Sequence, residues 1–263
     1  MMKLGIIRGF DNASFDYVKD RGLEFIELCR NNHKEAEAVV SNVESIKANI
    51  ARTGIPIGSI GRWAADPNTG GKIDAVELKA LTDLLDAAVA VNCPVFVCGC
   101  NYDKNVSMYK NYNAALELFG TFLDRVKGKN IKIAVYNCSW ENFVYNPSTW
   151  NVVLGELPEL MIKYDCSHSF ERGDNYLAEL SDWGDRVAHM HVKGAVKAGS
   201  KHVDDSPAGM DGIDWKQVFA IMYSRKYDGG LSIEPHSATW RADSELGEKG
   251  IGFTMNYIRQ FIL

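Results

Sequence analysis

Three stretches in the last hundred residues decide the fold: residues 160–168 (LMIKYDCSH), 186–193 (RVAHMHVK) and 229–236 (GGLSIEPH). Each begins as an apolar run of about 5 to 6 residues and closes on a carboxylate or an imidazole. Short apolar runs with polar residues at their ends are typical of buried strands that meet loops. The three stretches therefore predict strands whose ends carry a functional site.

Outward from these stretches, strand-like and helix-like segments alternate along the whole chain. Further strands are predicted in residues 3–9, 24–29, 55–63, 94–100 and 131–138. Helices are predicted in residues 15–22 after a Ser14 cap, 34–53 before Gly54, 74–91, 147–157, 175–183, 214–225 and 247–262, with a long helix ending near residue 127. Eight strand–helix units in 263 residues predict one domain, 1–263, folded as a (β/α)8 barrel. Active sites of such barrels lie at the carboxyl ends of the strands, where the polar residues fall.

Composition argues against several classes of partner. The net charge is −5, from 34 acidic and 29 basic residues without a basic cluster, which disfavours a nucleic-acid groove. No apolar stretch approaches the ~20 residues of a membrane span, and the N-terminal run is too short for a signal peptide. Six scattered cysteines indicate reduced, buried thiols. We expect a cytoplasmic protein with a small-molecule partner; a homo-oligomer is possible, but no interface is indicated.

The strand ends offer a set of metal ligands. Carboxylates and an imidazole from separate strands, here Asp165, His191 and Glu234, suit a divalent cation such as Mn, Co, Zn or Mg. Because side chains alternate with period 2, His189, His191 and Lys193 share one face of their strand. The alternative for the three ligands is a buried hydrogen-bonded network without metal.

With these motifs in view, the chain resembles the xylose isomerase-like barrels of the sugar phosphate isomerase/epimerase family, whose relatives include tagatose 3-epimerase, inosose dehydratase and endonuclease IV. The resemblance runs the full length and is strongest in YDCSH, HMHVKG, VYNC and the stretch ending in GGLSIE. It implies a TIM barrel with Asp165, His191 and Glu234 as metal ligands. It also implies that His168 contacts a substrate oxygen near the metal.

One strand end departs from the family pattern. Where the family's fifth strand usually ends in Glu-Asn, and that Glu is a fourth ligand and a second base, this chain has Tyr136 and Asn137. A phenol with a pKa near 10 is a poor metal ligand, so two-carboxylate epimerisation is in doubt. Glu234 remains the candidate base, with Tyr136 as proton donor and His168 beside the reacting oxygen.

These residues predict an enzyme that moves a proton next to a carbonyl. We expect a metal-dependent isomerase or epimerase acting on a sugar, keto-sugar or cyclitol, with manganese among the candidate cations. A lyase or hydratase acting by β-elimination on a keto-sugar or ketoglycoside is the alternative, and a non-catalytic sugar-binding barrel is a third. Candidate substrate contacts are Asn137, His168, Lys193, His236, Trp140, Arg8 and Trp63.

Overall fold

Eight parallel strands form the centre of the fold in the computed structural model, which describes residues 1–263. Their hydrogen-bonded order, β1-β12-β9-β8-β7-β6-β3-β2, is that of a closed barrel. The strands are β1 (Lys3–Ile7), β2 (Ile26–Arg30), β3 (Ile57–Arg62), β6 (Val95–Cys98), β7 (Lys132–Tyr136), β8 (Met161–Asp165), β9 (Val187–Val192) and β12 (Gly230–Ile233). The predicted (β/α)8 barrel is confirmed.

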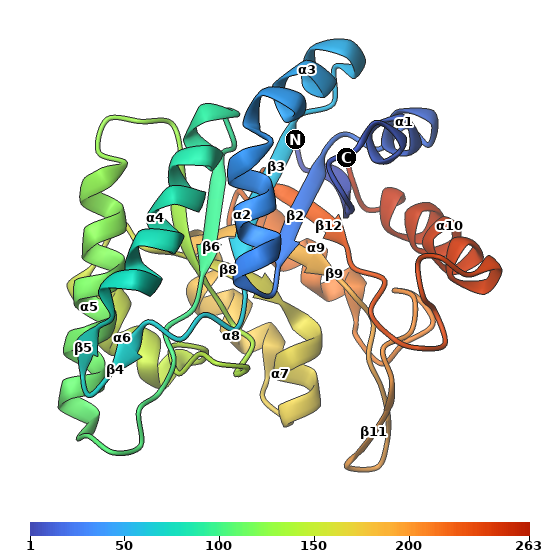
Figure 1. Cartoon of the computed structure of the whole chain (residues 1–263). Helices are drawn as coiled ribbons and strands as arrows, with labels where there is room; N and C mark the ends of the chain where they lie inside the picture. Colours follow the sequence, from blue (N-terminus) through green and yellow to red (C-terminus); the bar gives the residue numbers. More distant parts are fainter. The chain divides into compact units, whose positions relative to one another are not determined.

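Ten α-helices alternate with the strands (Figure 1). They are α1 (Asn12–Asp20), α2 (His33–Ser41), α3 (Val43–Thr53), α4 (Ala75–Ala90), α5 (Met108–Arg125), α6 (Pro147–Glu156), α7 (Cys166–Arg172), α8 (Tyr176–Trp183), α9 (Trp215–Ser224) and α10 (Glu245–Arg259). None of these helices combines the length and the apolarity that crossing a bilayer would require. All six cysteines are free thiols, and four of them are buried.

Two compact units make up the chain: Met1–Ile7 with Tyr164–Leu263, and Arg8–Lys163. We call them the C-terminal unit and the N-terminal unit. The assignment of residues 1–263 to one domain stays a prediction.

The N-terminal unit follows the predicted order of elements, with two corrected helix boundaries. Helix α1 is capped by Asp11, whose Oδ1 accepts a hydrogen bond from the backbone N–H of Ser14 at 2.8 Å, so Ser14 is not the cap. The segment predicted as one helix, 34–53, is two helices that meet at Asn42. The Asn42 amide donates to the carbonyl of Ala38 at 2.8 Å, a side-chain bond that competes with helix continuation. Gly54 ends α3 as predicted, with φ +78°.

The C-terminal unit places β12 between β1 and β9. Ser232 on β12 is in register with Gly5 on one side and with His191 on the other. The chain also forms a hairpin that the sequence did not predict, β10 (Val196–Ala198) with β11 (Lys201–Asp204). A second unpredicted hairpin, β4 (Asn68–Thr69) with β5 (Lys72–Ile73), belongs to the N-terminal unit.

A buried polar network fixes the short helix α7 against α8. The Tyr164 hydroxyl donates to Glu179 Oε2 at 2.6 Å, and the Ser169 hydroxyl donates to the same oxygen at 2.7 Å. Both side-chain donors are buried and Glu179 is 6% exposed, so the carboxylate has little access to water. The network holds α7 in place, and α7 carries His168 and Glu171 toward the ends of the strands.

Asp211, in the loop before α9, gives the fold a pH dependence. Its carboxylate accepts from the Trp215 indole N–H at 3.0 Å and from Gly209 N–H at 3.1 Å. Burial raises its pKa from 3.8 to about 6. The protonated carboxyl therefore stabilises the fold below pH 3.8, and that contribution is lost as the pH rises through about 6. After solvent screening we expect the loss to be about 2 kcal/mol.

Asp211→Asn should keep the acceptor for Trp215 without the charge. As the pH is raised from 5 to 7.5, the melting temperature of the variant should therefore rise relative to that of the wild type. Thermal unfolding of both proteins across this range tests the prediction, with Asp228→Asn as a matched loop control. A difference between variant and wild type that does not change with pH would contradict it.

Candidate metal centre

Three residues that the sequence singled out converge at strand ends of the C-terminal unit. Asp165 is the last residue of β8, His191 lies in β9, and Glu234 follows β12. One ligand atom from each lies within 4.8 Å of the others. Asp165 and His191 are almost fully buried, whereas the Glu234 side chain is 18% exposed. The arrangement is a buried three-residue cluster with one edge open to solvent.

Hydrogen bonds from Ser167 orient the Asp165 carboxylate. Its Oδ1 accepts both the backbone N–H of Ser167 at 2.9 Å and the Ser167 hydroxyl at 2.7 Å. Asp165 thereby caps α7, since these bonds satisfy the first turn of the helix. Its Oδ2 lies toward the other members, 3.5 Å from His168 Nε2 and 3.9 Å from His191 Nδ1.

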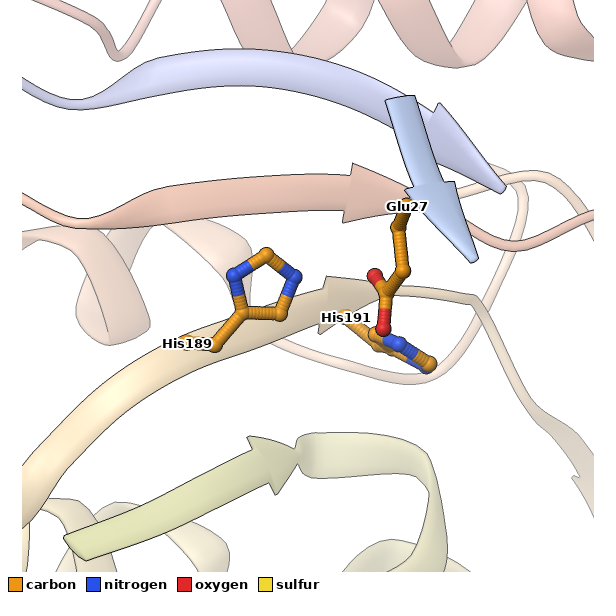
Figure 2. Close-up of side chains that lie close together, drawn as sticks. All are labelled: Glu27, His189 and His191. Atoms are coloured by element: carbon orange, nitrogen blue, oxygen red, sulfur yellow. The ribbon is translucent and has the colours of Figure 1, made fainter. Parts of the chain in front are cut away.

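The two histidines of β9 occupy successive levels of the strand. Figure 2 shows the side chains of His189 and His191 extending from the same strand, β9. Their ring centroids lie 6.1 Å apart, with the ring planes at 81°. His191 Nδ1 lies 2.9 Å from Glu234 Oε2, whereas His189 Nε2 lies 2.9 Å from the Ser232 hydroxyl. His189 thus hydrogen-bonds the neighbouring strand, and His191 faces the carboxylates.

Lys193 brings a permanent positive charge to the cluster. Its Nζ lies 3.5 Å from Asp165 Oδ2 and 3.6 Å from Glu234 Oε2, and its side chain is 3% exposed. Burial disfavours the ammonium, but the carboxylates of Glu234 and Asp165 outweigh burial and raise the pKa of Lys193. Burial likewise opposes the Glu234 carboxylate, yet Lys193 and His191 hold its pKa well below the usual range. Both groups are charged at neutral pH.

The remaining predicted residues of this unit lie at the edge of the cluster. The His168 side chain, on α7, is 19% exposed. His236 is 55% exposed, and its Nδ1 lies 3.4 Å from Glu234 Oε1. Contact with Glu234 raises the pKa of His236. A cavity of about 20 Å³, room for one water, lies beside Lys193, Asp205 and Glu234.

The chemistry of the donor set fits a divalent cation. Two carboxylates and one imidazole are ligands that Mn, Co, Zn and Mg accept. Lys193 is no closer than 3.5 Å to either carboxylate, which is longer than a charge-assisted hydrogen bond of about 2.8 Å. The carboxylate oxygens are therefore not committed to the ammonium by direct hydrogen bonds.

Five predicted residues belong to the N-terminal unit. Tyr136, at the end of β7, is fully buried, and its hydroxyl donates to the carbonyl of Trp140 at 3.0 Å. Its ring stacks on Trp63 at 5.5 Å. Asn137 is fully buried and the Trp140 side chain is exposed, whereas the Arg8 guanidinium lies 3.5 Å over the ring of Tyr17. Arg8 is thus engaged in a contact within its own unit.

Tyr136 is a neutral phenol. Burial, together with the nearby thiols Cys98 and Cys138, raises its pKa well above 10. A phenol in this state stays protonated at neutral pH and does not act as a base.

The sequence analysis did not single out several other residues whose side chains could bind a metal. Glu171, His202 and Asp205 form a second group with ligand atoms within 4.8 Å of one another. The spacing His-x-x-Asp in residues 202–205 was the signal that could have found them. Glu27, drawn with the histidines in Figure 2, belongs to the N-terminal unit, where it lies fully buried on β2.

The chain belongs to the xylose isomerase-like TIM barrel family, whose family model matches residues 15–260. No curated protein sequence matches it. Among solved structures, it is similar to 3-keto-D-glucoside 4-epimerase from E. coli, at 17% identity over 99% of this chain and 100% of that chain, with a TM-score of 0.76. It is also similar to D-allulose 3-epimerase from Methylomonas sp., at 16% identity over 98% and 96% of the two chains, with a TM-score of 0.77. A third is a probable 3-DHS dehydratase from Bacillus anthracis, at 13% identity over 98% and 99%, with a TM-score of 0.69.

Proposed function

We propose that this protein is a divalent-metal-dependent enzyme that isomerises or epimerises a sugar, keto-sugar or cyclitol. The observation that carries the proposal is the convergence of Asp165, His191 and Glu234 at the ends of three strands. Two of the similar structures are named as sugar epimerases, which supports carbohydrate as the substrate class. A cation held by the three residues would supply Lewis acidity toward the oxygens of a carbonyl and its neighbouring hydroxyl.

In this proposal Glu234 moves the proton. Its contacts with Lys193 and His191 hold the pKa of Glu234 well below the usual range, so the carboxylate is ionised and can accept the proton from the carbon beside the carbonyl. The electron pair of the broken C–H bond becomes the C=C bond of the enediolate, and the carbonyl oxygen takes up the negative charge. The proton of the neighbouring hydroxyl passes to that oxygen, and return of the first proton to the former carbonyl carbon gives the isomer. His236, exposed and 3.4 Å from Glu234 Oε1, connects the carboxylate to solvent.

Other residues of the cluster orient the proposed metal ligands or contact the substrate. Lys193 balances the charge of the two carboxylates, and Ser167 holds Asp165 in one orientation through two hydrogen bonds. His168 Nε2, 3.5 Å from Asp165 Oδ2 and partly exposed, is placed to donate to a substrate oxygen. Arg8, Trp63, Asn137 and Trp140 stay candidate substrate contacts from the sequence.

A lyase or hydratase is the second candidate, because the sequence has Tyr136 where the family pattern has a second carboxylate. Epimerisation at one carbon by two opposed bases needs a second proton acceptor, and a buried phenol with a raised pKa does not provide one. One base and one acid suit β-elimination next to a carbonyl. The similarity to a probable dehydratase supports this alternative.

Solvent isotope exchange separates these outcomes. The protein, loaded in turn with Mn, Co, Zn or Mg, is incubated in D2O with ketoses, 3-keto-glucosides and inososes, and products are followed by NMR. Deuterium on carbon together with a new isomer is the expected result. Loss of water and a new double bond would instead establish the lyase. Binding of a sugar without deuterium entering it under any cation would overturn the enzyme proposal and leave a binding protein.

A further inference from the structure

A second cluster of metal-ligating side chains lies outside the candidate metal centre and shares no residue with it. Glu171 is on α7, His202 is in β11, and Asp205 directly follows β11. His202 Nε2 lies 3.2 Å from Asp205 Oδ1 and 3.6 Å from Glu171 Oε1. Ligands bound about 2.1 Å from a tetrahedral zinc ion lie about 3.4 Å apart. The two measured separations bracket that value.

The two carboxylates of this cluster favour the binding of a cation. Burial, and the neighbouring Asp205 carboxylate, raise the pKa of Glu171. The ammonium of Lys193 also attracts the carboxylates of Glu171 and Asp205. Its ion pairs, however, are with Asp165 and Glu234. His202 is the basic group in contact with both carboxylates of the cluster, and an imidazole nitrogen is a common metal ligand.

The position of the cluster gives a bound cation a structural task. The hairpin of β10 and β11 extends as an arm from the C-terminal unit (Figure 1). Lys197 of the hairpin already donates to the carbonyls of Phe170 and Glu171, both at 3.1 Å, at the end of α7. Ligands from both the hairpin and α7 would add a second tie between the same two elements.

We propose that Glu171, His202 and Asp205 form a second divalent-cation site that fastens the β10–β11 hairpin to α7. One imidazole and two carboxylates suit a borderline cation such as Zn²⁺, with water completing the coordination. The site connects to the candidate metal centre, since Asp205 Oδ2 lies 4.0 Å from His236 Nε2, and His236 contacts Glu234. The hairpin would thereby be fixed beside the open edge of that centre.

Metal stoichiometry of the full chain tests the site without any assay of activity. Protein stripped with chelator is dialysed against Zn²⁺ and analysed by plasma mass spectrometry. We expect two equivalents in the wild type, one in His202→Ala and Glu171→Gln, and one in Asp165→Asn. His33→Ala is the matched control, because His33 is an exposed histidine 2.7 Å from a carboxylate, that of Glu77, and outside any three-ligand group; it should keep both equivalents.

Proteolysis supplies a second measurement. Lys201 is exposed on β11, so trypsin should cut the arm there, and Zn²⁺ should slow that cut about tenfold in the wild type but not in His202→Ala. Equal stoichiometry in the wild type, His202→Ala and Glu171→Gln would overturn the proposal. A wild type with one equivalent that is lost in Asp165→Asn would also overturn it, while leaving the proposed function intact.

Discussion

Replacing Glu234 by glutamine should lower kcat by about 10³-fold at saturating cation. The amide has nearly the same shape as the carboxylate but accepts no proton, so deprotonation of carbon loses its base. The contact with His191 Nδ1 at 2.9 Å also changes character, because a neutral oxygen replaces an anionic one. Initial rates measured over a titration of the cation separate the two effects: weakened cation binding is overcome by concentration, whereas the missing base is not.

The matched control is Glu245→Gln. Glu245 is 85% exposed at the start of α10 and pairs with Lys249, so the same chemical change there should leave kcat unchanged. Solvent deuterium exchange into the substrate should fall together with turnover in Glu234→Gln. A variant that turns over at the wild-type rate once the cation is saturating would remove Glu234 from proton transfer and leave it as a ligand alone.

The polar residues of the strand ends could be predicted from the sequence because period and chemistry agree there. In β9, His189 and His191 follow the two-residue alternation of a strand, and in β12 Ser232 does the same with Glu234 beyond it. The register between neighbouring strands is not contained in a single sequence and comes from the structure. The pairing of Ser232 with His191 puts Glu234 beside Lys193, which is why these two form an ion pair.

Helix α7 was not predicted because its seven residues are too few to show a helical period. The sequence therefore suggested that His168 lies at a strand end, like Asp165. In the structure Asp165 ends the strand and caps the helix at once, and His168 lies on the first turn. That turn brings the imidazole back to within 3.5 Å of Asp165 Oδ2.

The β10–β11 hairpin escaped prediction for a different reason. Residues 201–205 (KHVDD) show no apolar run, so the sequence gives no signal for a strand there. A turn at Gly199 with φ +62° closes the hairpin, and the bonds of Lys197 hold it to the end of α7. Because those partners are distant in sequence, the cluster of Glu171, His202 and Asp205 becomes visible only in three dimensions.

Replacing Lys193 by methionine should have opposite effects on the metal-free and the metal-bound protein. Methionine has a similar volume and no charge, so in the absence of cation Asp165 and Glu234 are left as neighbouring carboxylates without their buried counter-charge. We expect the free energy of unfolding of the metal-free protein to fall by about 3–5 kcal/mol. The same loss of positive charge should tighten binding of Mn²⁺ or Zn²⁺ on the order of tenfold to a hundredfold.

Thermal unfolding with chelator and with added cation measures both effects, and isothermal titration gives the affinities. The metal-induced rise in melting temperature should be larger in Lys193→Met than in the wild type, because binding energy adds to the stability of the folded state. Lys193→Arg keeps the charge and should keep a weak, wild-type affinity, whereas Lys249→Met removes an exposed ammonium and should change neither quantity. If Lys193→Met binds the cation more weakly than the wild type, Lys193 does not compete with the cation for the carboxylates and instead helps to hold them in place.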